Sequence, residues 1–177
     1  MRYLERDEAQ REAFLALLEG IEKKRLYYLD ECGVEHNLYR PCARAPRGQE
    51  VYVDTPGSRR ERSSVISASQ DGRLVAPMVF SGSCDHAVVE AYFGKLLLPT
   101  IPKGSVIVLD NARFHRCSST HELVEKAGCT LLFLPVYSPD LNPIEHVWAA
   151  LKQWLQTRLC KAKNKMLCIR KACLAFV

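Results

Sequence analysis

The chain has 177 residues, of which 47% are hydrophobic and 25% charged, a composition typical of one globular domain rather than a disordered chain. Its apolar runs are too short to span a bilayer and no secretion signal opens it, so we expect a cytoplasmic protein without a membrane partner. The net charge of +5 is compatible with nucleic-acid binding but does not by itself indicate it.

The eight cysteines are scattered along the chain, without a C-x-x-C pair. Structural zinc sites show closely spaced ligand pairs, so this spacing argues against zinc. A disulfide framework is typical of secreted domains, and no secretion signal is present. We therefore expect reduced thiols, several of them packed as small apolar side chains.

The first part of the chain predicts one helix followed by strands. Residues 7–24 carry apolar side chains at helical spacing and predict a lead-in helix. Residues 26–31 are apolar and aromatic and end in acids, which predicts a buried strand with carboxylates at its C-terminal end. Residues 32–49 are expected to form a loop with a short strand, and residues 50–54 are a candidate strand.

A hairpin is predicted next. Residues 63–69 and 73–80 favour strands and flank an Asp71-Gly72 pair. Asp-Gly between two such runs is a strong signal for a tight hairpin turn. Asp71 is therefore interpreted as a turn residue and not as a catalytic candidate.

Helices and strands then alternate. Helices are predicted at residues 87–98 and 121–127, and apolar strands at residues 105–110 and 130–134. The whole pattern predicts an α/β domain with a mixed sheet covered by helices. The strands at 26–31 and 105–110 should be central, because strands buried on both faces lose their alternation.

A last long helix is predicted to begin around Asn142. Asparagine favours the cap, and Pro143 would take the first helical position with Glu145 at the third. Apolar residues at helical spacing then define one buried face, which includes Trp148. Trp148 and Trp154 are interpreted as packing residues rather than platforms for base stacking. The tail from Arg158 onward could continue as another helix.

Three acids stand out by their context. Asp30 and Asp110 each end a strand that we expect to be central, and Glu145 lies in the first turn of the last long helix. Parallel neighbouring strands would bring the two aspartates to one sheet edge, where the helix could add Glu145. Magnesium prefers such oxygen ligands, and two ions could activate an attacking oxygen and stabilise a leaving one.

Three motifs occur in order along the chain: YLDE at 28–31, VLDNARFH at 108–115 and LPVYSPDLNPIEHVW at 134–148. Together they resemble the transposases of the bacterial insertion-sequence 630 group, relatives of the Tc1/mariner superfamily. The 34 residues between Asp110 and Glu145 match the spacing of that superfamily. The resemblance runs from about Leu26 to about Leu159, which is most of the chain.

The resemblance implies a ribonuclease-H-like fold, with a five-stranded mixed sheet flanked by helices. It implies that Asp30, Asp110 and Glu145 are catalytic residues and ligands of Mg2+ or Mn2+, with two ions expected. Asp30 would bridge the ions, and the other two acids would each hold one. Supporting roles are implied for three further residues, Asn111, His115 and Asn142.

The resemblance also implies a function, namely DNA transposition by phosphodiester hydrolysis and strand transfer. The expected partners are double-stranded DNA, both transposon ends and TA-containing target, and a second copy of the chain in a homodimer. The corresponding regions would be a connector helix at 1–25, the DDE catalytic domain at 26–160 and a helical tail of the same domain at 161–177. Transposases of this group carry helix-turn-helix domains before the catalytic domain, so we expect end-specific DNA recognition to come from outside this chain.

Several plainer alternatives stay open. Glu145 could be part of a capping box at its helix start, and Asp30 and Asp110 could merely accept hydrogen bonds at strand ends. Glu31 is left out of the triad because adjacent strand residues point to opposite faces. The whole chain could be another ribonuclease-H-like nuclease, or an inactive DNA-binding remnant of a transposase.

A basic cluster precedes the hairpin and consists of Arg59, Arg60 and Arg62. A solvated surface is the default interpretation of such a cluster. In a DNA enzyme these side chains could also contact phosphates.

Overall fold

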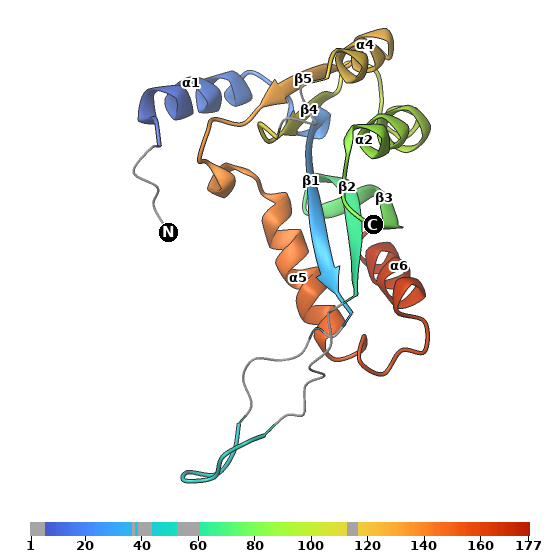
Figure 1. The fold of residues 1–177 in the computed structure, drawn as a ribbon. Coiled ribbons are helices and arrows are strands. Elements are labelled where there is room, and N and C mark those ends of the chain that lie inside the picture. The colour runs from blue at the N-terminus through green and yellow to red at the C-terminus, as the bar shows by residue number, and fades with distance from the viewer. Residues whose placement is uncertain (1–5, 37, 39–43, 53–60, 113–116) are drawn as a thin grey trace.

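The computed structural model describes residues 6–36, 38, 44–52, 61–112 and 117–177. Within these residues a five-stranded mixed sheet has the order β3-β2-β1-β4-β5, flanked by helices (Figure 1). The elements in chain order are α1 (Glu8–Glu19), η1 (Lys23–Arg25), β1 (Leu26–Glu35), β2 (Arg62–Gln70), β3 (Arg73–Ser81), α2 (His86–Tyr92), η2 (Phe93–Leu97), α3 (Leu98–Thr100), β4 (Val106–Leu109), α4 (Ser118–Lys126), β5 (Thr130–Phe133), η4 (Pro139–Leu141), α5 (Ile144–Gln156) and α6 (Lys165–Ala175).

The antiparallel half of the sheet contains the predicted hairpin. β2 pairs with β3, and the two central turn residues, Asp71 and Gly72, have φ angles of 49° and 76°. Two positive φ angles match the twist of a two-residue hairpin loop, and aspartate followed by glycine tolerates them well. Asp71 is thus confirmed as a turn residue.

The parallel half of the sheet is shorter than β1 itself. β1 pairs with β4 from Leu26↔Val106 to Tyr28↔Val108, whereas its antiparallel pairing with β2 continues to Glu35. Asp30 therefore lies within β1, and the prediction that it ends the strand was wrong. The strand continues because β2 goes on supplying hydrogen-bond partners after β4 has stopped.

Alternate residues of β1 face two different cores. Tyr27 and Leu29 belong to a cluster with residues of α2, η2 and α4, while Cys32 and Val34 belong to a cluster with α5 and α6. A third cluster joins Phe14 of α1 to residues of β1 and β4. The sheet is thus buried on both faces, as expected for central strands without polar alternation.

Several element boundaries differ from the predictions. The helix expected at 87–98 begins at His86 and continues through a π-helical turn, η2, into α3, which includes Pro99. Residues 50–52 of the candidate strand are not in a strand, and residues 53–54 lie outside the described part of the chain. The tail does form a helix, α6, whose buried residues pack against α5 and β3.

The cysteines and helices agree with the composition. The seven cysteines in the described ranges form no disulfide, and Cys32, Cys129 and Cys173 are buried as small core residues. None of the helices that the structure describes is both long and apolar enough to cross a bilayer.

Candidate active site

Asp30 is held from the helix side of the sheet. Its Oδ2 accepts a hydrogen bond of 3.0 Å from the indole Nε1 of Trp148, which is 2% exposed. Trp148 lies in the second turn of α5, so this bond ties α5 directly to β1. Trp148 packs in the core as predicted, and it also orients a carboxylate, which the sequence did not reveal.

The surroundings of Asp30 disfavour its negative charge. The pKa of the Asp30 carboxyl is raised to about 7, mainly by burial and to a smaller extent by the nearby carboxylates of Glu31 and Glu145. A backbone hydrogen bond at Glu31 and the bond from Trp148 act in the opposite direction. A buried carboxylate beside other acids is an arrangement that a bound cation would stabilise in its ionised form.

Glu145 is an exposed residue in the first turn of α5, three residues before Trp148. Residues three apart share one side of a helix, so Glu145 and Trp148 both face the region of Asp30. The electrostatic effect of Glu145 on Asp30 agrees with this placement. The two acids therefore lie near one another although 114 residues separate them in the sequence.

The capping interpretation of Glu145 is not supported. α5 begins at Ile144 after Pro143, and no side chain caps it. A capping box needs a backbone N–H at the cap residue, which proline lacks. The prediction that the side chain of Asn142 caps the helix was also wrong, since only its backbone oxygen accepts from Glu145 N, at 3.2 Å.

Asn142 is nevertheless buried, at 5% exposure, in the chain that enters α5. Its Oδ1 has no hydrogen-bond partner among the described residues. Because the side chain neither caps α5 nor contacts another described polar group, its supporting role stays a prediction.

Asp110 follows β4 directly, at the end of the parallel pairing with β1. The parallel pairing ends at Tyr28↔Val108, so Asp30 and Asp110 each lie two residues beyond the same paired position on adjacent strands. Asp110 Oδ1 accepts a 3.0 Å hydrogen bond from Ala112 N, which shapes the loop after the strand. The predicted juxtaposition of the two aspartates agrees with this register and stays a prediction, and the strand that ends at this position is β4 and not β1.

The predicted supporting residue Asn111 has a clear structural contact. Its Nδ2 donates to the backbone oxygen of Leu134 at 2.5 Å, which joins the loop after β4 to the end of β5. This bond holds the loop that carries Asp110. His115 lies outside the described residues.

The acid cluster fits divalent cations that share their coordination with other ligands. Among the described residues, no three His, Cys, Asp or Glu side chains already converge on one ion position. Magnesium commonly uses one or two carboxylates together with water and substrate phosphates. The buried carboxylate of Asp30, with Glu145 near it and Asp110 on the adjacent strand, supplies such a donor set.

Glu31 belongs to the opposite face of the sheet, as predicted. Its charge contributes to the raised pKa of the Cys84 thiol, about 12, which is due mainly to burial. It acts in the same direction on Tyr92, a buried residue of α2. Glu31 thus faces the α2 side, whereas Asp30 faces α5.

A lysine completes the α5 side of the site. Lys152 lies seven residues after Glu145, two helical turns along the same side of α5. Burial raises the pKa of the Cys32 thiol, and the charge and hydrogen bond of Lys152 oppose that rise. One cation therefore lies beside the acid cluster. The spacing of seven from Glu145 was a signal in the sequence that could have revealed it.

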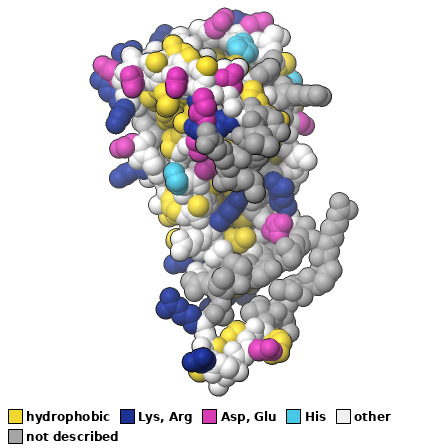
Figure 2. Space-filling view, turned by 90° about the vertical axis from the view of Figure 1, so that its left-hand side faces the viewer, with side chains coloured by type: hydrophobic (Ala, Val, Ile, Leu, Met, Phe, Trp, Pro, Cys, Tyr) yellow, Lys and Arg dark blue, Asp and Glu magenta, His cyan; other side chains and the backbone are white. Residues whose placement is uncertain are grey.

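The basic cluster is only partly described. Arg62 begins β2 with an exposed side chain, and its guanidinium lies so close over Gly33 that a β-carbon there would be 2.0 Å from Nη2. Arg59 and Arg60 lie outside the described residues. Figure 2 shows Lys and Arg side chains spread from top to bottom of the drawn face, so charge alone does not mark a DNA path.

A family comparison decides where this arrangement belongs. The family model described as DDE superfamily endonuclease matches residues 25–167, which include all three acids. The chain belongs to this family. A protein of insertion element IS630 from Shigella sonnei is 30% identical over 138 residues, covering 70% of this chain and 40% of the relative. The Tc3 transposase of Caenorhabditis elegans is 41% identical over 56 residues, covering 32% of this chain and 16% of the relative.

Solved DDE-family structures share the fold. A Mos1 transposase paired-end complex with the left transposon end superposes with a TM-score of 0.65 at 14% identity, covering 99% of this chain and 62% of that one. The Mos1 mariner catalytic domain gives 0.54 at 14% identity, covering 93% and 83%. The ribonuclease-H-like fold is thereby confirmed. The chain spans well under half the length of the curated relatives it matches.

Proposed function

We propose that this chain is the catalytic domain of a DNA transposase that cuts phosphodiester bonds and joins the freed ends to target DNA. The observation that carries the proposal is the Trp148–Asp30 hydrogen bond, which sets the helix of Glu145 against the strand of Asp30. The parallel register of β1 and β4, which ends two residues before Asp30 and Asp110, supports the inclusion of Asp110. Membership of the DDE endonuclease family supports the reaction class.

Asp30, Asp110 and Glu145 would hold two Mg2+ or Mn2+ ions, which polarise a phosphoryl oxygen and lower the pKa of an attacking water when bound. Trp148 keeps one oxygen of Asp30 oriented. Lys152 adds a positive charge that could pair with a phosphate of the bound strand.

The reaction has two displacements at phosphorus. In the first, a water oxygen bonds to phosphorus and the bond to the 3′-oxygen breaks, which leaves a 3′-hydroxyl and a 5′-phosphate. In the second, that 3′-hydroxyl attacks a target phosphodiester, and the target's own 3′-oxygen leaves. No covalent enzyme intermediate is needed, so positioned carboxylates suffice.

The proposed partners are double-stranded DNA at transposon ends and targets, with a second copy of the chain in the active complex. Solved Mos1 relatives include paired-end and strand-transfer complexes, and paired-end complexes with Mn and with Mg. Arg62 and Lys152 are the described basic residues that we assign to phosphate contact, and Arg59 and Arg60 would extend the Arg62 side.

A strand-transfer assay tests this function. The full chain is incubated with Mn2+, a short duplex with a free 3′-hydroxyl and a supercoiled plasmid, and joined products are measured beside those of Asp110→Asn. Joining by the wild type, lost in the variant, is expected. Preferential cleavage of an RNA–DNA hybrid without joining would instead indicate another ribonuclease-H-like nuclease. DNA binding without cleavage or joining would indicate an inactive remnant.

A further inference from the structure

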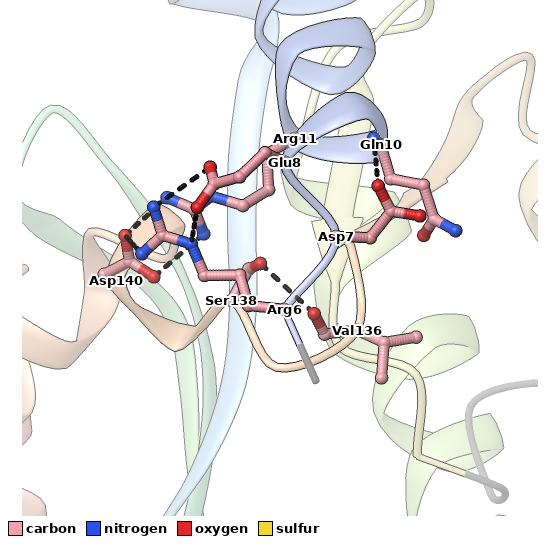
Figure 3. Close-up of polar contacts among 8 residues, drawn as sticks. All are labelled: Arg6, Asp7, Glu8, Gln10, Arg11, Val136, Ser138 and Asp140. Atoms are coloured by element: carbon pink, nitrogen blue, oxygen red, sulfur yellow. Dashed lines mark hydrogen bonds and ion pairs between the residues drawn. The ribbon is translucent and has the colours of Figure 1, made fainter. Parts of the chain in front are cut away.

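The buried Arg11 of α1 forms an ion pair with Asp140, which lies in the turn that leads into α5 (Figure 3). Arg11 donates from Nη1 to Asp140 Oδ1 at 3.0 Å and from Nη2 to Asp140 Oδ2 at 2.6 Å. The Arg11 side chain is 8% exposed and the Asp140 side chain 54%. Two parallel bonds between guanidinium and carboxylate fix relative orientation as well as distance.

Other residues reinforce this pair. Arg6 Nη1 lies 4.0 Å from Asp140 Oδ2, and Glu8 lies 3.7 Å from Arg11 Nε. Beside the charges, Phe14 of α1 and Leu141 belong to the same apolar cluster. The contact between α1 and the turn is therefore both ionic and apolar. Asp140 thus has a partner 129 residues away in the sequence.

The turn that carries Asp140 is continuous with the first turn of α5. Leu141 N donates to Ser138 O at 3.1 Å, Asn142 N to Pro139 O at 2.9 Å, and Glu145 N to Asn142 O at 3.2 Å. Each bond spans three residues, so no unbonded linker separates η4 from Glu145. Two prolines, Pro139 and Pro143, restrict the same segment further.

α5 has no side-chain N-cap to fix its first turn. No side chain caps its N-terminus, although α1, α2 and α6 each have an N-cap side chain that accepts a backbone N–H. The direction of the first turn of α5 must therefore be set by contacts outside the helix. Those contacts include the packing of Ile144 in the core, the Trp148–Asp30 bond after Glu145 in the sequence and the Arg11–Asp140 pair before it.

We propose that Arg11 is a positioning residue for Glu145, acting through Asp140 and η4. α1 is then part of the working domain and not only a connector, because the Arg11–Asp140 pair couples it to the turn before Glu145. The inference rests on the proposed metal-binding role of Glu145 for its consequence. The positioning itself can be measured without any activity.

Hydrogen exchange of the first turn of α5 tests the positioning directly. Wild type, Arg11→Gln and Asp140→Asn are compared by amide exchange of peptides covering residues 138–148. The matched control is Asp7→Ala, which removes the N-cap of α1 (Gln10 N to Asp7 Oδ1, 3.1 Å) but leaves the Arg11–Asp140 pair intact. Mn2+ affinity of the same four proteins is measured by electron paramagnetic resonance.

Arg11→Gln and Asp140→Asn should both show faster amide exchange at residues 138–148 than wild type. Both should also bind Mn2+ about 10-fold more weakly, as when an outer partner of a metal ligand is lost. Asp7→Ala should speed exchange within α1 and leave Mn2+ affinity unchanged. Wild-type exchange at 138–148 in both Arg11→Gln and Asp140→Asn would overturn the inference. If the two variants exchange faster but even wild type binds no Mn2+, the positioning by Arg11 is supported and the proposed function is not. Asp140→Asn keeps a half-exposed residue of the same shape, so it remains informative if Arg11→Gln does not fold.

Discussion

The indole N–H of Trp148 donates to Asp30 across the space between α5 and β1. This bond fixes the rotation of α5 about its own axis, because a helix can place only one side toward a given strand residue. Glu145 and Lys152 share that side at spacings of three before and four after Trp148. This one hydrogen bond therefore helps to orient both the carboxylate of Glu145 and the ammonium group of Lys152.

Trp148→Phe should separate packing from this orientation. Phenylalanine fills most of the pocket but cannot donate, so Asp30 loses one partner. We expect metal-dependent cleavage to fall about 10- to 100-fold, as for other supports of metal ligands, and the free energy of unfolding to fall by about 1–3 kcal/mol. Cleavage rates and denaturant unfolding measure the two effects. Trp154→Phe is the control, since that ring stacks under Arg158 at the surface. Equal cleavage by Trp148→Phe and wild type would refute the orienting role.

Asp30→Asn should abolish cleavage while stabilising the metal-free protein. The amide removes a buried charge that burial and the neighbouring acids disfavour, yet it can still accept from Trp148. We expect the free energy of unfolding at pH 8 without metal to rise on the order of 1–3 kcal/mol. Glu31→Gln, on the other face of β1, should keep cleavage near wild type. A lower free energy of unfolding in Asp30→Asn than in wild type would show that the charge of Asp30 does not destabilise the metal-free protein.

The Arg11–Asp140 pair should make stability depend on acid pH. The hydrogen bond and charge of Arg11 lower the pKa of the Asp140 carboxyl below its ordinary value of 3.8. A lowered folded-state pKa means stabilisation that is present above the unfolded value and lost as pH falls through the folded one. The difference in unfolding free energy between wild type and Asp140→Asn should thus be constant from pH 5 to 8 and shrink below about pH 4. A difference that does not change with pH would mean that the pair contributes no charge-dependent stability.

Arg62 should contribute one phosphate contact. Removing one such contact lowers the slope of log affinity against log salt by about 1 for duplex DNA. We expect this change in Arg62→Ala, with little loss of stability because the side chain is exposed. Gly33→Ala should give a similar change, since its β-carbon would displace the guanidinium. Gly94→Ala is the control, because a β-carbon there meets nothing within 4 Å. If the slope of log affinity against log salt is the same in Arg62→Ala and wild type, Arg62 does not contact a DNA phosphate.

Local patterns predicted the parts of the fold that local physics determines. The Asp71-Gly72 turn was predictable because two positive φ angles demand such residues. The ends of the strands were harder to predict. β1 continues beyond Asp30 because β2 supplies hydrogen-bond partners there, and the sequence of β1 alone does not reveal its partner. The start of α5 was misplaced by one residue for a similar reason, since capping propensity gave way to the turn at η4.

The three acids of the proposed site could be named from the sequence, whereas the contacts that orient their elements could not. Asp30, Asp110 and Glu145 stand in motifs that carry a strong resemblance, and their contexts within the chain are distinctive. The contacts that orient them join residues 118 and 129 positions apart, namely Trp148 with Asp30 and Arg11 with Asp140. No periodicity links such pairs, so only the fold reveals them.

The carboxylates of Asp30, Asp110 and Glu145 are proposed to form one divalent-cation site. This site is tested most directly by electron paramagnetic resonance of Mn2+ added to wild type and Asp110→Asn, each with a short DNA duplex present to supply phosphates. A shared site predicts saturable binding in wild type that is lost or strongly weakened in Asp110→Asn. Binding of the same number of ions with the same affinity in both proteins would contradict it.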